Sequence, residues 1–312
     1  MREIRLKASS DEDFGGVLLG EDSYDTLVTG EDVDVYKPDG SVLLKYRVGV
    51  IPRGVSRAAY QNLRDAASPT NNRGVAGGKI DRNRIAPSYR DRELVISADG
   101  FNYSPVLING KKSKTTYSNE VNSGIVGYFD RYPRIPYCRQ TAYSLKHSEK
   151  FRAAVPFFQE VSRVYEKEMP KAFERQKKIY DETSSDFKIP GSVYTTVTVN
   201  KNWQTAAHTD KGDYPEGFGC LAAFSLGKYR GAYLCFPAFR VAVDLQTSDV
   251  LLADVHEFHG NTPFKVSGPY ERLSLVLYYR EMMKDCGSAA YELERAKKNG
   301  AKIRAETDLC GE

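Results

Sequence analysis

The sequence predicts an α+β fold in which helices buttress a double-stranded β-helix, or jelly-roll, core. Short runs of β-forming residues recur in the second half of the chain, turns separate them, and a stretch with helical periodicity precedes them. Six or more short strands separated by turns are typical of a jelly roll. The expected strands span residues 192–200, 218–226, 232–236, 240–245, 250–255 and 272–279.

Two helices are expected directly before these strands. Between residues 148 and 183, apolar side chains such as Phe151, Val155 and Phe158 recur at helical spacing, and Pro170 interrupts the pattern. Proline removes a backbone N–H and clashes with the preceding turn, so one helix should end and another begin there. We expect both helices to cover one face of the sheet.

The chain is expected to form one catalytic unit with four parts. Residues 41–51 predict a strand and residues 55–67 a short helix, which indicates a folded N-terminal region. A final amphipathic helix is expected over residues 289–298. The expected parts are an extension packed on the core (1–67), loops with the first core strands (68–147), the helical buttress with the jelly-roll core (148–286), and a C-terminal helix and tail (287–312).

Composition excludes few classes of function. The formal net charge of +4 and the isoelectric point near 8.6 permit a polyanionic partner without requiring one. The five cysteines are odd in number and form no Cys-x-x-Cys pair, so neither a zinc site nor a disulfide framework is indicated. A reducing compartment is the simpler interpretation.

Targeting signals are not evident in the sequence. No apolar run approaches the roughly 20 residues of a membrane span, and the first residues lack the apolar stretch of a signal peptide. We expect an intracellular protein, in a nucleus or in the cytoplasm of a host cell, that is not secreted, contacts no membrane and is a monomer.

The strongest chemical signal is a set of three metal-ligand types. His208 and Asp210 form a His-x-Asp pair after one expected strand, and His259 lies in a His-Gly-Asn run after a later one. Two imidazoles and one carboxylate on one face of Fe(II) leave three positions for a cosubstrate and O2. A His-x-Asp pair alone occurs by chance in roughly a third of such sequences, so the order of all the motifs carries the prediction. His256 is a rival for the third position.

A cosubstrate anchor is expected downstream of the metal ligands. Arg272 and Ser274 lie two apart in an expected strand, so their side chains point the same way. A guanidinium offers a planar pair of donors to a carboxylate, which suits the distal end of 2-oxoglutarate. The alternative is an exposed arginine that pairs with Glu271.

Several runs resemble the TET/JBP family of nucleic-acid-modifying, Fe(II)- and 2-oxoglutarate-dependent dioxygenases, with the phage and algal branches nearest. The runs are residues 195–200, 205–213, 217–219, 249–252 and 259–263. The resemblance implies Fe(II), 2-oxoglutarate and O2 as cofactors and DNA as the partner. It also places the Cys-Arg-x-Thr-Ala-like run at 138–142 beside the cosubstrate and the flipped base, which makes Arg139 a candidate contact of the cosubstrate. Because an algal branch uses ascorbate, ascorbate is an alternative cosubstrate.

A glycine-rich segment between residues 68 and 87 is expected to be a loop. It could be a mobile surface loop, or its small residues could let the backbone approach phosphates that basic side chains neutralise. The resemblance favours the second interpretation. The basic candidates for DNA-backbone contacts are Arg73, Lys79, Arg82 and Arg84.

Asp213 is the candidate for reading the target base. It follows Asp210 by three positions, where the resemblance implies a base contact, and Asn122 and Ser123 are weaker candidates. A carboxylate can accept a hydrogen bond from the amino group of cytosine, whereas the O4 atom of thymine would repel it. This favours 5-methylcytosine, oxidised to 5-hydroxymethylcytosine or further, unless Asp213 only caps a turn.

Other functions stay open at this point. Within the same family, the chain could hydroxylate thymine or attach a fragment of ascorbate to 5-methylcytosine. Outside it, the chain could be a jelly-roll oxygenase that acts on a protein or a small molecule, or a nucleic-acid-binding module with an idle metal site. An intact set of metal ligands argues against the last alternative.

Overall fold

The computed structural model describes residues 2–133 and 135–309. The α-helices are α1 (Arg53–Leu63), α2 (Pro87–Arg90), α3 (Ala142–Lys146), α4 (Ser148–Glu168), α5 (Pro170–Glu182) and α6 (Ala289–Leu309). The strands are β1 (Arg2–Arg5), β2 (Thr26–Val28), β3 (Val33–Tyr36), β4 (Val42–Arg47), β5 (Ser68–Thr70), β6 (Leu94–Ile96), β7 (Tyr103–Pro105), β8 (Val121–Phe129), β9 (Arg139–Gln140), β10 (Thr196–Lys201), β11 (Gly219–Gly231), β12 (Leu234–Phe236), β13 (Val241–Val243), β14 (Val250–Ala253), β15 (Gly260–Asn261) and β16 (Phe264–Tyr278). Short 3-10 helices are η1 (Glu21–Ser23), η2 (Gly74–Gly77), η3 (Arg82–Arg84), η4 (Ser185–Phe187), η5 (Pro237–Phe239) and η6 (Glu281–Asp285).

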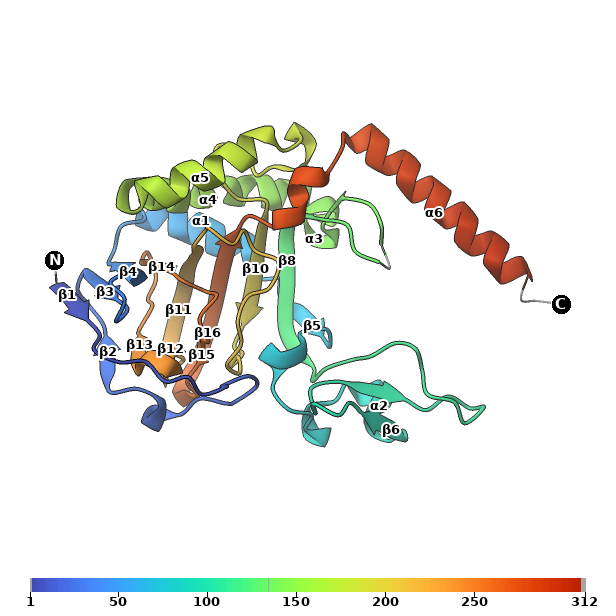
Figure 1. The fold of residues 1–312 in the computed structure, drawn as a ribbon, viewed down its shortest axis with the longest axis horizontal. Helices are drawn as coiled ribbons and strands as arrows, with labels where there is room; N and C mark the ends of the chain where they lie inside the picture. Colours follow the sequence, from blue (N-terminus) through green and yellow to red (C-terminus); the bar gives the residue numbers. More distant parts are fainter. Residues whose placement is uncertain (1, 134, 310–312) are drawn as a thin grey trace.

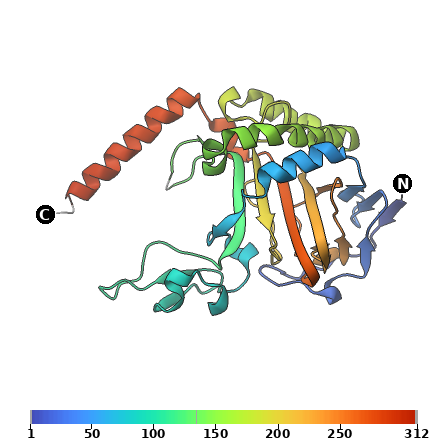
Figure 2. The ribbon, with the colours of Figure 1, turned by 180° about the vertical axis from the view of Figure 1, so that it is seen from behind.

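Two sheets face each other in the core. The large sheet has the order β1-β3-β4-β14-β11-β16-β10-β8-β5, with β9 paired to β8. The small sheet has the order β15-β12-β13-β2. Helices α1, α4 and α5 cover the outer face of the large sheet (Figures 1 and 2). The expected α+β fold with a jelly-roll core buttressed by helices is therefore confirmed, and α4 and α5 meet at Pro170 as predicted.

Both faces of the large sheet are buried, and its side chains alternate between them. In β16, Leu273, Leu275 and Leu277 pack with the helices in one apolar cluster. In β11, Leu221 and Ala223 belong to a second cluster, which fills the space between the two sheets. Because successive residues of a strand point to opposite faces, each strand contributes side chains both to the cluster with the helices and to the cluster between the sheets. The residues of β16 between the leucines are thus free to line a cavity.

The N-terminal residues are part of the sheets. Strands β3 and β4 extend the large sheet beyond β14, and β2 pairs in parallel with β13 of the small sheet. Val33, Val35 and Leu44 are fully buried there. The first 67 residues, expected as an extension packed on the core, thus supply core strands as well as helix α1.

Residues 68–120 form a lobe beside the free edge of the large sheet (Figure 1). It contains β5, the short β6–β7 sheet and a cluster of tyrosine rings in mutual contact, Tyr89, Tyr103 and Tyr117. The glycine-rich segment expected as a loop is more ordered than its composition indicates, because η2 and η3 form within it. Asn119 holds it by donating to the carbonyls of Gly77 and Lys79.

A disulfide corrects the expectation drawn from the cysteines. Cys138 and Cys286, 148 residues apart in sequence, are bonded, whereas Cys220 and Cys235 are free and buried. Cys310 lies outside the described residues, as do residues 310–312 of the expected tail. The pairing could not be read from spacing because it depends on where the fold brings two distant segments.

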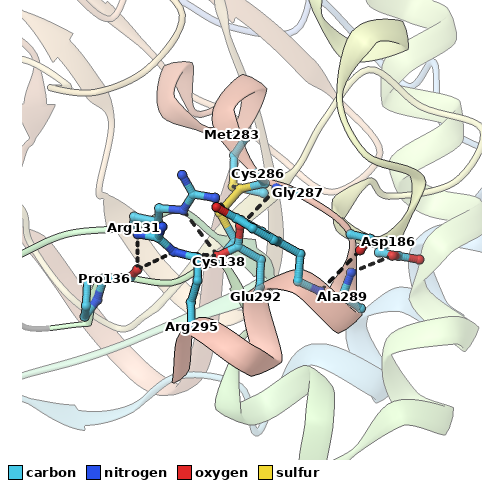
Figure 3. A network of polar contacts seen from close by, with 12 residues as sticks. Arg131, Pro136, Cys138, Asp186, Met283, Cys286, Gly287, Ala289, Glu292 and Arg295 are labelled. Carbon is cyan, nitrogen blue, oxygen red and sulfur yellow. Dashed lines mark hydrogen bonds and ion pairs between the residues drawn. A yellow bond between two sulfur atoms is a disulfide. The ribbon is translucent and has the colours of Figure 1, made fainter. Parts of the chain in front are cut away.

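Glu292, in the first turn of α6, ties the same two segments together (Figure 3). Its carboxylate is almost fully buried and accepts hydrogen bonds from Arg131 and from the backbone N–H groups of Cys138 and Gly287, the latter two at 2.8 and 2.9 Å. Arg295, one turn further along, donates to the carbonyl of Pro136. Beyond this anchor, α6 runs away from the body of the protein (Figures 1 and 2).

Among the helices of the described residues, none combines the length and the apolar character that crossing a membrane requires.

Candidate active site

Two backbone segments that are distant in sequence meet in the cavity between the sheets. The N–H of His208 donates to the carbonyl of His259, and the N–H of His259 donates to the carbonyl of His208, both at 2.9 Å. A Cβ atom at Gly260 would lie 2.9 Å from the backbone nitrogen of Ala207, so a glycine is needed after His259 for this close approach. The His-Gly run therefore has a packing reason as well as a chemical one.

The ligand atoms of the expected metal site converge. One donor atom each from His208, Asp210 and His259 lies within 4.8 Å of the other two. The Nε2 atoms of the histidines lie 3.5 and 3.8 Å from the carboxylate oxygens of Asp210. Each Nδ1 atom instead lies near a backbone carbonyl, that of Ala206 or Glu257, at 2.8 and 3.0 Å. These contacts fix Nδ1 as the protonated nitrogen and leave the Nε2 lone pairs free for a metal.

The electrostatics of the three groups suit a divalent cation. Burial and the neighbouring His208 lower the pKa of His259 to about 4, so its ring is neutral at pH 7. Burial raises the pKa of Asp210, but the hydrogen bond with His208 and the nearby imidazoles outweigh it, so the net shift is downward. Burial lowers the pKa of His208, but the hydrogen bond and the charge of Asp210 outweigh it and raise that pKa, so a cation at this position would compete with a proton on His208. A neutral imidazole and an ionised carboxylate are the states in which these groups bind metals. The donor set thus fits Fe(II).

His256, the rival for the third position, lies apart from the three ligands. Its Nδ1 atom contacts Asp254 at 3.1 Å, and its side chain is partly exposed. It is absent from the group of side chains that converge on the metal position. The structure thus brings His259, and not His256, to His208 and Asp210.

Arg272 is buried in the same cavity. It is 4% exposed, and the backbone N–H of Arg272 donates to Asn202 at 2.7 Å. Among the described residues, no carboxylate lies within ion-pair distance of its guanidinium, whereas the adjacent Glu271 points the other way and pairs with Lys201. Burial lowers the pKa of Arg272, which is the cost of holding a charge without an acidic partner. The alternative of an exposed pair with Glu271 is therefore wrong.

The cavity has a volume of about 250 Å3 and contains both the metal ligands and Arg272. Arg272, Ser274, Val276 and Tyr278 line it from β16, as their shared face requires. Asn200 lines it from β10 and accepts a hydrogen bond of 2.6 Å from Ser123. Ser123 therefore supports a wall residue, and Asn122 is exposed on the other face of β8. Neither contacts the cavity directly, so their expected role as base contacts is not supported.

Asp213 and Arg280 face each other at one end of the cavity. The segments carrying them are paired, with the N–H of Glu281 donating to Gly212 and that of Tyr214 to Tyr279. The Oδ2 atom of Asp213 is buried and has no hydrogen-bond partner among the residues that the structure describes. Burial, together with the charge of Asp210, raises the pKa of Asp213 well above its ordinary value. An unpartnered carboxyl in a cavity wall is suited to a polar ligand.

Arg73 lies in the cavity wall, which corrects its expected place on the DNA-facing surface. It lines the cavity together with Asn72, and its Nε atom is buried with no hydrogen-bond partner in the described part of the chain. Burial lowers its pKa, partly offset by Tyr278 and Asp210. The other basic candidates of this segment do lie on the lobe surface. Lys79 and Arg82 are exposed, Arg84 is half-buried, and none of them lines the cavity.

Arg139 is also placed differently from its expected position beside the cosubstrate. It lines a neighbouring groove of about 1050 Å3 and is not part of the cavity wall. Its guanidinium stacks on Phe129 and Tyr132 and donates to the carbonyl of Asp130 at 3.2 Å. The structure therefore does not support a contact between Arg139 and 2-oxoglutarate.

Arg280, Asn200 and Tyr278 are cavity residues that the sequence interpretation missed. A signal for two of them was present, because positions 272, 274, 276, 278 and 280 continue one alternation. Arg280 is held by Asp130, with the arginine Nε 2.9 Å from the carboxylate, and by the ring of Phe129, 4.1 Å from the guanidinium carbon.

Comparisons with known proteins identify the family of this chain. The Tet_JBP family, described as the oxygenase domain of the 2OGFeDO superfamily, matches residues 124–281. Thymine dioxygenase JBP1 of Trypanosoma brucei brucei is 36% identical over 195 residues, which are 60% of this chain and 22% of that protein. The JBP1 protein of Crithidia fasciculata is 38% identical over 175 residues, or 54% of this chain and 21% of that protein. The chain thus spans about a fifth of the length of the curated relatives it matches.

A solved structure supports the fold independently. NgTET1, solved in complex with 5mC DNA, superposes with a TM-score of 0.53 at 16% sequence identity, covering 90% of this chain and 89% of that one. At this identity the likeness concerns the architecture alone. The matched family region contains the three converging ligands and the buried arginine, so the chain belongs to the TET/JBP family of 2OGFeDO oxygenase domains, whose cofactors are Fe(II), 2-oxoglutarate and O2.

Proposed function

We propose that this chain hydroxylates the 5-methyl group of a pyrimidine in DNA. The supporting observation is the layout of the cavity, in which an arginine for the cosubstrate and the polar pair Asp213 and Arg280 lie around one metal position. Arg272 and Tyr278 are six residues apart on one strand, a separation of roughly 20 Å. The cavity therefore offers separate places for a dicarboxylate and for a flat base with polar edges.

Each side chain has a defined task in this proposal. His208, Asp210 and His259 hold Fe(II), and Arg272 with Ser274 binds the distal carboxylate of 2-oxoglutarate. The bound iron supplies the oxidising chemistry, in which O2 gives one oxygen atom to the methyl group and one to succinate while CO2 leaves. Asp213 and Arg280 position the base so that its methyl group faces the metal, which is the main contribution that a protein can make here. The base must leave its stack to reach this depth.

Thymine is the first substrate that we propose. The curated relatives are named thymine dioxygenases, and their similarity covers more than half of this chain. Asp213 does not oppose thymine as the sequence interpretation assumed, because its raised pKa makes the neutral acid accessible. A neutral carboxyl can donate to O4 and accept from N3–H of thymine, whereas the ionised form can only accept.

The second candidate is 5-methylcytosine in DNA. It is favoured by the unpartnered oxygen of Asp213, which as a carboxylate would accept from the N4 amino group. Arg280, facing Asp213, can donate to O2 of either base or to N3 of 5-methylcytosine. The two candidates thus share the reaction and differ in the hydrogen-bonding edge of the base.

Incubation of the iron-loaded protein with two oligonucleotides tests the proposal. One carries thymine as its only 5-methylpyrimidine and the other carries only 5-methylcytosine, and mass spectrometry of the nucleosides detects 5-hydroxymethyluracil or 5-hydroxymethylcytosine. Asp210→Ala serves as the inactive control, and succinate release measures cosubstrate use. Asp213→Ala should reduce base oxidation and retain iron. If DNA fails to stimulate succinate release while a peptide or a metabolite does, the proposal is overturned.

A further inference from the structure

The groove beside the iron cavity carries a second inference, which rests on the proposed function. The groove and the cavity share three residues, Asn72, Arg73 and Arg280. The two spaces therefore adjoin at these side chains and can hold parts of one ligand. A base inserted into the cavity remains attached to its sugar and phosphates, which must lie at or beyond this junction.

Arginine and aromatic side chains follow one another from the junction into the groove. The guanidinium carbon of Arg280 lies 4.1 Å from the ring centre of Phe129, and that of Arg139 lies 5.0 Å from the same ring. Arg139 also lies 5.2 Å from the ring centre of Tyr132. Arginine held on aromatic rings keeps its donors in a fixed plane, and exposed aromatic rings offer a surface to a neighbouring base.

The charge of the groove is positive. Arg139 and Lys146 line it, and neither has an acidic partner among residues 2–133 and 135–309. Asp65, also in the lining, is paired with Lys150 at 2.9 Å, and Arg280 is paired with Asp130. Arg139 thus keeps donors available, since its one hydrogen bond goes to a backbone carbonyl. Unpaired cations with aromatic rings in one groove suit a phosphodiester strand.

We propose that this groove binds the backbone of the DNA strand that carries the reactive base, with Arg139 contacting one phosphate that flanks that base. The fork of the guanidinium matches the phosphate oxygens, and Tyr132, partly exposed, gives the adjacent nucleotide a surface for stacking. Arg139, expected from sequence to touch the cosubstrate, is thereby assigned to the nucleic acid.

Binding without turnover tests the contact. A labelled single-stranded oligonucleotide with one thymine is titrated anaerobically onto the protein loaded with Fe(II) and 2-oxoglutarate. Arg139→Ala should weaken binding roughly tenfold or more, as loss of a charge-assisted hydrogen bond does. The slope of log affinity against log salt should fall by about 0.7, the value for one phosphate of a single strand.

A double-mutant cycle identifies the phosphate. The phosphates on either side of the thymine are replaced one at a time by a neutral methylphosphonate. At one position, Arg139→Ala should weaken binding no further, whereas at the others the two losses should add. Arg230→Ala is the matched control, because Arg230 is exposed on β11 and lies outside the groove lining. It should lower affinity less and should show no coupling at any position.

The outcomes separate this inference from the proposed function. Arg139→Lys provides a second variant that keeps the charge, and DNA-independent succinate release shows that each variant is folded and holds iron. Unchanged affinity in Arg139→Ala, or additive losses at every phosphate, overturns the groove assignment even if thymine is oxidised. Coupling at one phosphate supports it even if neither pyrimidine is oxidised, in which case only the proposed function fails.

Discussion

His208 and His259 exchange backbone hydrogen bonds, each N–H donating to the other's carbonyl at 2.9 Å, and their ring centres lie 4.6 Å apart. The pairing fixes the two imidazoles relative to each other before any metal is bound. Backbone contacts of this kind do not depend on the ligand, so the metal-free protein should already be folded. This contrasts with zinc fingers, in which the metal drives folding.

Replacement of His259 should remove iron without unfolding the protein. His259→Ala is expected to lose stoichiometric Fe(II) and all 2-oxoglutarate turnover, because only two ligands remain on the metal. His256→Ala, the matched control, should keep both, since His256 contacts Asp254 away from the site. Metal analysis after reconstitution and a circular dichroism spectrum measure the two effects. Retained iron in His259→Ala and its loss in His256→Ala would reverse the assignment.

Arg272 should determine the affinity for 2-oxoglutarate. Arg272→Ala removes a buried guanidinium that has no acidic partner among the described residues, so the KM for 2-oxoglutarate should rise about 100-fold. Iron binding should persist because Arg272 contacts none of the ligands. Steady-state succinate release gives the KM. The result would contradict the assignment if the KM stayed within about twofold of the wild type.

Replacing Arg73 should stabilise the protein and lower its activity on DNA. The Nε atom of Arg73 is buried and has no hydrogen-bond partner among the described residues, and burial lowers the pKa of the guanidinium. The cavity wall therefore holds a poorly compensated charge. Arg73→Met keeps the length of the side chain and removes that cost, and it should stabilise the protein by about 1 kcal/mol or more. Activity on DNA should fall at the same time, because Arg73 lines the junction between the cavity and the groove. Denaturant unfolding and DNA oxidation rates measure the two changes. Lower stability with unchanged activity would show that Arg73 is structural.

Glu292 should make the stability depend on pH in the acidic range. Burial raises its pKa, but the hydrogen bonds from Arg131, Cys138 and Gly287 outweigh this, so the net shift is downward. A carboxyl with a lowered folded-state pKa stabilises the protein above its unfolded pKa of about 4.3, and this contribution disappears as the pH falls through the folded value. Glu292→Gln should therefore cost about 2 kcal/mol at pH 7 and much less at about pH 3. Urea unfolding at both pH values measures the difference. An equal cost at both would exclude a role for the charge.

The disulfide between Cys138 and Cys286 should contribute to stability. It closes a loop of 148 residues, and removing such a cross-link from the unfolded chain typically costs about 2 to 5 kcal/mol. The two bonded and the two free cysteines are all buried, so the thiols are counted by labelling in denaturant, in a Cys310→Ser background. Two thiols, Cys220 and Cys235, should react without reductant and four after reduction. Cys138→Ser with Cys286→Ser provides the stability comparison. Four reactive thiols without reductant would contradict the bond.

Much of the fold was predictable because its signals are local. The period of the apolar residues indicated α4 and α5, and Pro170 marked their junction, since proline affects only its own neighbourhood. The converging ligands were predictable for a different reason. A metal needs particular side chains, and the chain has only four histidines. The order of His208, Asp210 and His259 in the sequence was therefore enough to recognise them.

Interactions between distant segments could not be predicted in the same way. Arg73 and Arg139 are both arginines in polar, loop-like stretches, and nothing local distinguishes a cavity wall from a groove. The disulfide was missed because it depends on the path of α6 and the loop before β9. Burial is a property of the assembled structure, so charged residues are the ones whose places a sequence specifies least.

Strand β16 fixes the spacing of the side chains along the cavity. Side chains 272, 274, 276 and 278 project from one of its faces into the same cavity, and Arg280 is the second residue after its end. The span between Arg272 and Arg280 is therefore set by the count of peptide units, which no rotamer change can alter. Deleting one residue within this span would exchange the two faces of the strand. Leucines would then enter the cavity, and the polar side chains would turn toward the helices. The loss of one residue from β16 should therefore abolish the reaction.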